Sequence, residues 1–78
     1  MTVVITEDVK KALDYMVEVV HQQNGAKNAE ALRELIRVAN IHNYTVDGVC
    51  DLLKNAGLRA RGNIRDFVEQ ELKALESV

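Results

Sequence analysis

The chain contains no proline and no tryptophan, and it has a single cysteine among its 78 residues. Without proline, no helix has to break at a residue that lacks a backbone N–H. One cysteine excludes a disulfide within the chain, and no residues cluster at metal-ligand spacing. A domain of this size buries only about 60% of the surface of its unfolded chain. We therefore expect one domain over residues 1–78, stabilised by helix packing or by a second subunit rather than by cross-links.

Long apolar runs are also lacking. No stretch approaches the roughly 20 apolar residues that cross a bilayer, so we expect no membrane partner. The start of the chain lacks the basic segment of a signal peptide and becomes acidic at Glu7 and Asp8. Together with an unpaired cysteine, these features predict a cytoplasmic protein.

The net charge is only −2, which gives the chain no general attraction to nucleic acid or to anionic lipid. The charge is unevenly distributed, however. Residues 1–24 carry −2, residues 25–65 carry +3 and residues 66–78 carry −3. An anionic partner would therefore contact the middle of the chain.

The sequence does contain four apolar stripes at three- and four-residue spacing, which is the pattern of amphipathic helices. Polar turns separate the stripes, among them Asn24-Gly25 and Asn55-Ala56-Gly57. A residue of N-cap type precedes each stripe: Thr6, Asn28, Thr45 and Asn63. The pattern predicts an all-α domain of four helices, at about residues 6–23, 28–42, 45–56 and 63–76, with an extended arm at residues 1–5.

The main stripes predict the hydrophobic core. We expect it to contain Leu13, Val17, Leu32, Leu35, Ile36, Val49, Leu53, Phe67, Val68 and Leu72.

A second apolar edge runs along the first two helices, on Tyr15 and Val19 in the first and on Val38 and Ile41 in the second. A helix that is apolar on more than one face is buried on more than one side. These four residues are therefore predicted to line a surface that contacts a second copy or another protein. The alternative is that they cover the remaining helices of the same chain, in a well-packed monomer.

No catalytic or metal-binding set is apparent. His21 and His42 are the only histidines, whereas a zinc site needs three or four ligands. Cys50 lies on the apolar stripe of the third helix, where a buried and unreactive thiol is expected. We expect no metal, no cofactor and no enzyme activity.

Five basic residues are candidates for contact with an anion or with nucleic acid: Lys27, Lys54, Arg59, Arg61 and Arg65. Their side chains and the N–H groups at the start of the fourth helix can hold a phosphate or a carboxylate. The alternative is a solvated turn in which some of them pair with Asp51 or Asp66.

The first half of the chain resembles the ribbon-helix-helix fold of small dimeric repressors. Residues 2–6, Thr2-Val-Val-Ile-Thr, stand where that family has a strand, and residues 25–37 resemble its turn and second helix. The resemblance covers residues 2–39 and implies a dimer whose paired strands contact DNA. In this chain the strand would present Thr2, Val4 and Thr6.

The missing catalytic set and the extra apolar edges favour a small, non-enzymatic protein–protein interaction module, such as an adaptor or an inhibitor. It would act through a helical surface and form a homodimer. The alternative, which follows from the resemblance, is a dimeric DNA-binding transcriptional regulator of ribbon-helix-helix type.

Overall fold

Four helices form where the apolar stripes lie, in a computed structural model that describes residues 5–23, 25–60 and 62–76. The helices are α1 (Glu7–His21), α2 (Gly25–Ile41), α3 (Val46–Asn55) and α4 (Asn63–Glu76). The described part of the chain contains no strand, which confirms the all-α prediction. Residues 1–4, where most of the predicted arm falls, lie outside the described residues.

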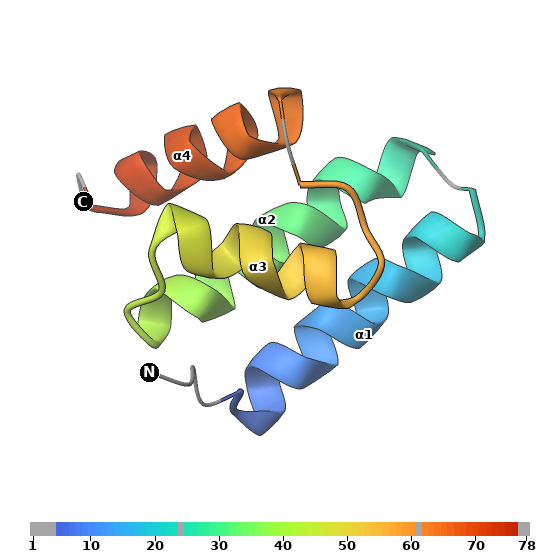
Figure 1. Cartoon of the computed structure of the whole chain (residues 1–78), viewed down its shortest axis with the longest axis horizontal. Coiled ribbons are helices and arrows are strands. Elements are labelled where there is room, and N and C mark those ends of the chain that lie inside the picture. Colours follow the sequence, from blue (N-terminus) through green and yellow to red (C-terminus); the bar gives the residue numbers. More distant parts are fainter. Residues whose placement is uncertain (1–4, 24, 61, 77–78) are drawn as a thin grey trace.

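The longest helix, α2, is the centre of the fold (Figure 1). It packs against α1 on one side and against α4 on another, and α3 packs against α4. Helices α1 and α2 run antiparallel, because Asp8 in the first turn of α1 contacts His42 just after α2. The Cα radius of gyration is 11.5 Å, close to the roughly 11–12 Å expected of a compact chain of this length.

The ends of α2 and α3 are both closed by Schellman motifs. After α2, Asn43 adopts a φ of 61°, and the Tyr44 N–H donates to the Ala39 carbonyl at 3.0 Å. After α3, Gly57 adopts a φ of 81°, and the Leu58 N–H donates to the Leu53 carbonyl at 2.8 Å. A left-handed residue followed by such a bond satisfies carbonyls that a helix end would leave unpaired. The endings expected from sequence at these two places are therefore confirmed.

The connection between α1 and α2 differs from the expectation. The left-handed residue is Gln23, with a φ of 56°, and Gly25 is the first residue of α2. Helix α2 thus begins three residues before Asn28, which is a helical residue rather than a cap. The early start keeps the connection short, so the two helices pack side by side along most of their length.

The three other predicted caps behave differently from one another. Thr45 caps α3 as expected, and its hydroxyl accepts from the Gly48 N–H at 3.1 Å. Thr6 occupies the N-cap position of α1, but its hydroxyl bonds no backbone N–H. Asn63 is the first residue of α4 and therefore not its cap. The Asp66 N–H donates to the Gly62 carbonyl at 3.1 Å, so the residue before Asn63 accepts the bond of the first helical turn.

Seven of the ten predicted core residues are buried: Leu32, Leu35, Ile36, Val49, Leu53, Val68 and Leu72. Leu13 and Phe67 are partly buried and pack against that core. Val17 is only half-buried and is not part of it.

The inward face of α1 is rotated from the predicted one. Its buried residues are Val9, Ala12, Met16 and Val19. Ala12 on α1 and Val38 on α2 are each 7% exposed, and the two helices pack against each other. The second edges are therefore only half covered within one chain, since Val19 and Val38 are buried whereas Tyr15 and Ile41 are exposed.

Gly48 in the first turn of α3 does not need the backbone freedom of glycine, because its φ is not positive. An added Cβ would lie 3.4 Å from Tyr44 Cδ2 and 3.5 Å from Thr45 Oγ1, which is ordinary van der Waals contact. We expect Gly48→Ala to raise the free energy of unfolding by about 0.5–1 kcal/mol in urea titrations, because alanine loses less backbone entropy on folding. The matched control is Gly57→Ala, where the positive φ should make the same change destabilising by about 1 kcal/mol. A loss of stability in Gly48→Ala would show that Tyr44 cannot accommodate the methyl group.

Candidate interaction surface

Tyr15 and Ile41 lie on one surface between α1 and α2, although they are far apart in the sequence. Both residues are exposed, at 43% and 60% of their full surface. They border a shallow groove of about 400 Å³, together with Ala12 and Val38, which are mostly buried. We call these four residues the α1–α2 face.

The α1–α2 face contains three of the four residues predicted for a partner surface. The fourth, Val19, is 1% exposed and belongs to the core of the single chain. Val38 is 7% exposed, so it supplies the floor of the groove rather than a projecting contact. The prediction that Val19 lies on an exposed surface is therefore wrong, because the side chain is buried within the single chain. Val38 reaches the surface only as the floor of the groove.

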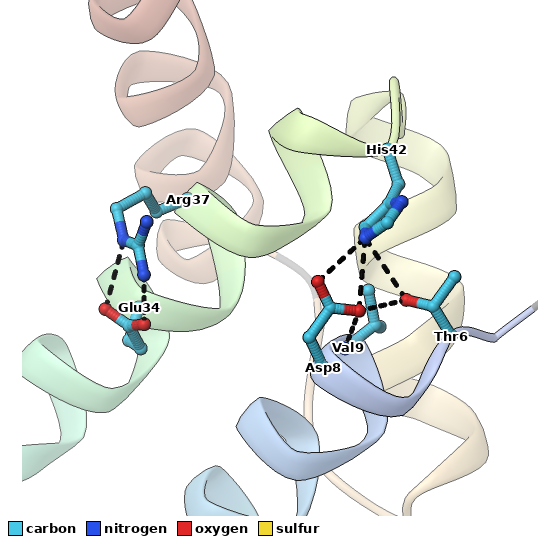
Figure 2. Close-up of polar contacts among 6 residues, drawn as sticks. All are labelled: Thr6, Asp8, Val9, Glu34, Arg37 and His42. Carbon is cyan, nitrogen blue, oxygen red and sulfur yellow. Dashed lines mark hydrogen bonds and ion pairs between the residues drawn. The ribbon is translucent and has the colours of Figure 1, made fainter.

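Charged residues of both signs surround this face: Asp8, Lys11, Glu34 and Arg37. Arg37 donates two hydrogen bonds to Glu34, from Nε at 3.2 Å and from Nη2 at 2.5 Å (Figure 2). The Arg37 guanidinium lowers the pKa of the Glu34 carboxyl, and the bonded carboxylate raises the pKa of Arg37. Both side chains are exposed, so the pair adds little to stability. Its effect is to orient two charges at the edge of the groove.

A second polar contact joins the beginning of α1 to the end of α2. His42 Nε2 lies 2.9 Å from Asp8 Oδ2 and 3.2 Å from Thr6 Oγ1, and the Thr6 hydroxyl donates to Asp8 (Figure 2). The hydrogen bonds from Thr6 and His42 lower the pKa of Asp8 to about 2. This contact explains why Thr6 does not cap α1 through its hydroxyl.

The Thr6, His42 and Asp8 contacts do not have the geometry of a catalytic triad. In a triad, the nucleophile and the carboxylate bond opposite nitrogens of the histidine ring. Here Thr6 and Asp8 both contact Nε2. Sequence reasoning missed the cluster because 34 residues separate His42 from Asp8, and no local pattern marks the pair.

Asp8 makes the stability of the fold depend on pH. Its folded-state pKa of about 2 lies below the ordinary value of 3.8, so its contribution is complete above pH 4 and disappears as the pH falls through 2. We expect Asp8→Asn to unfold at lower urea than the original chain at pH 6. The difference in urea midpoint between the two proteins should shrink to zero as the pH falls from 4 to 2. Asp14→Asn, which alters an exposed carboxylate of α1, is the control, and a pH-independent gap in Asp8→Asn would contradict the assignment.

The five predicted basic residues do not form one site. Arg65 pairs with Asp47, which raises the pKa of the guanidinium, so the alternative of pairing with Asp51 or Asp66 does not hold for this residue. Arg61 lies outside the described residues. The three others are exposed and form no ion pair with any described residue: Lys27, Lys54 and Arg59.

The remaining candidates give no further site. Cys50 is 1% exposed, as expected of a core thiol, and His21 is exposed at the end of α1. Within residues 5–23, 25–60 and 62–76, no group of three histidine, cysteine or acidic residues is placed to hold a metal ion. None of the four described helices has both the length and the apolar character that a bilayer crossing requires.

Comparison of the chain with known proteins finds no matching family model, no significantly similar curated protein and no significantly similar solved structure.

Proposed function

We propose that this chain is a small, non-enzymatic interaction module that pairs with a second copy of itself through the α1–α2 face. The observation that carries the proposal is the pattern of exposed large hydrophobic side chains. In the described part of the chain there are three: Ile5, Tyr15 and Ile41. Two of them lie on the α1–α2 face, and Ile5 precedes Thr6, which contacts the end of α2. Apolar side chains gathered inside a charged border are typical of a partner surface.

The charged border suits a second copy of the chain. A twofold dimer brings the same patch of both subunits together, so the patch must complement itself. Lys11 and Arg37 supply positive charge, and Asp8 and Glu34 supply negative charge around the same groove. In a twofold dimer each sign can face the opposite sign, which favours one orientation of the two copies.

The proposed dimer also adds apolar burial that a chain of this size needs, since a single core of this kind rarely supplies more than about 3–5 kcal/mol. Through its remaining surface the dimer would act as an adaptor or as an inhibitor of another protein. We place it in the reducing cytosol, because its single thiol is buried and unpaired.

The test is to place acidic side chains on the α1–α2 face. In light scattering at micromolar concentration, we expect the original chain to show twice the 8.7 kDa mass of one chain. The variant with Tyr15→Glu and Ile41→Glu should show a single-chain mass, because unpaired carboxylates would be buried at the interface. Both positions are exposed in the single chain, so the variant should keep its helical circular dichroism.

The control is Ala74→Glu, at an exposed position of α4 away from this face, and it should leave the dimer intact. A single-chain mass for the original protein would overturn the proposal. So would a double variant that remains dimeric.

A further inference from the structure

A second groove, separate from the α1–α2 face, lies between the end of α1, the start of α2 and the start of α4. Gly57, Leu58 and Arg59 of the connection from α3 to α4 border it; Figure 1 shows this connection passing from the end of α3 to the start of α4. Its volume is about 520 Å³, within the range of about 300–1,000 Å³ that is typical of binding clefts. The two grooves share no lining residue.

The lining of the second groove is mainly apolar. Leu32 and Leu53 are buried beneath it, and Leu58, Ile64 and Phe67 are only partly buried along it. These last three side chains pack against the core on one side and leave apolar surface toward the groove. An occupant with apolar anchors would therefore complete their burial.

One buried polar atom at the second groove lacks a partner. Asn28 lines the groove, and its Oδ1 is buried without a hydrogen bond from any described residue. Buried acceptors in folded proteins almost always receive a hydrogen bond. Because the chain itself covers Oδ1, an N–H or O–H group of an occupant can reach it only if the Asn28 side chain turns toward the groove.

The one charged side chain that lines the second groove is basic. It belongs to Arg59, and no carboxylate lines the groove. Farther out, Lys27 and Lys54 adjoin lining residues in the sequence, and so do Glu30 and Asp66. Arg59 is exposed and forms no ion pair within the described part of the chain. Its charge complements an acidic occupant.

We propose that the second groove docks an acidic amphipathic helix of another protein. Such a helix presents apolar anchors at i, i+4 and i+7 to the groove, and its flanking carboxylates face Arg59. Its side chains carry N–H and O–H donors as well as carboxylates, which distinguishes it from a lipid tail. The proposal shares with the proposed function only the general role of an interaction module. Because the surfaces are separate, dimerisation and docking can fail independently.

The experiment uses a displayed library of peptides of about four helical turns, with leucine fixed at the anchor positions and every flanking position randomised. The original chain and Arg59→Glu are each used for selection. We expect Asp and Glu to be enriched at the flanks against the original chain, and Lys and Arg against Arg59→Glu. A selected acidic peptide should bind Arg59→Glu at least about tenfold more weakly, as for a lost charge pair at an interface. Ala29→Glu, at another exposed lining position, should weaken the same peptide.

The matched control is Lys10→Glu, which makes the same charge change at an exposed position of α1 outside both grooves. It should bind the selected peptide as the original chain does. In ¹H–¹⁵N spectra, the peptide should shift the amide signals of Ala29, Leu58 and Ile64. Three results would each overturn the proposal. They are failure to enrich any peptide, the same charge preference in the selections against both proteins, and amide shifts centred on Tyr15 and Ile41.

Discussion

Leu35→Ala is expected to lower the free energy of unfolding by about 2–5 kcal/mol, as large-to-small changes at packed positions do. Leu35 is 0% exposed and lies on the central helix α2, which packs against both α1 and α4. Because the total stability of so small a domain is about 3–5 kcal/mol, the variant should be largely unfolded near room temperature.

Urea titration followed by circular dichroism measures the effect of Leu35→Ala. Leu75→Ala is the comparison, because Leu75 is only half-buried near the end of α4. This variant should lose clearly less free energy of unfolding than Leu35→Ala. Equal losses at the two positions would contradict the central place of α2 in the core.

Val19→Asp is expected to unfold the chain, whereas Val17→Asp should leave it folded. The two substitutions are chemically identical and lie two residues apart on α1. Val19 is 1% exposed, so its replacement would bury a carboxylate without a partner, at a cost of several kcal/mol. Val17 is half-buried and outside the core cluster, so a carboxylate there can reach water.

Helical circular dichroism and the dispersion of the amide proton spectrum distinguish folded from unfolded variants. The register expected from the main apolar stripe gives the opposite ranking, with the larger effect at Val17. An unfolded Val17→Asp beside a folded Val19→Asp would restore that register and place Val19 on the surface.

Local signals predicted much of this fold. The Thr45 cap and the exit at Gly57 depend on neighbouring backbone atoms, and both the start and the end of α3 agree with expectation to within a residue. Helix α4 also has the predicted limits, although Asn63 is its first residue and not its cap. Spacing alone also identified three of the six buried residues of α2, namely Leu32, Leu35 and Ile36, because its main apolar edge faces the core.

Features that depend on distant contacts were not predictable in this way. Two apolar edges on α1 compete for the core, and only the packing of the folded chain shows that Ala12 and Val19 are buried. The partner of Arg65 is Asp47, which lies on a different helix. Similarly, no spacing rule connects His42 with Asp8. Only the fold shows that Tyr15 and Ile41 line one groove and that Val19 does not, and their role as a partner surface stays a prediction.

The ribbon-helix-helix resemblance stays a prediction. Its strand would consist of residues 2–6, and Thr2 and Val4 lie outside the described residues. Titration of labelled duplex DNA at low and at moderate salt addresses it, because phosphate contacts make affinity fall steeply with salt.

Intermolecular nuclear Overhauser effects test the proposed dimer most directly. A sample is prepared by mixing isotope-labelled and unlabelled chains, and an isotope-filtered spectrum then reports only protons that are close across the two copies. We predict signals from the Tyr15 ring and the Ile41 methyl groups of one copy to the α1–α2 face of the other. Absence of intermolecular signals at millimolar concentration, or signals confined to α3 and α4, would contradict pairing through this face.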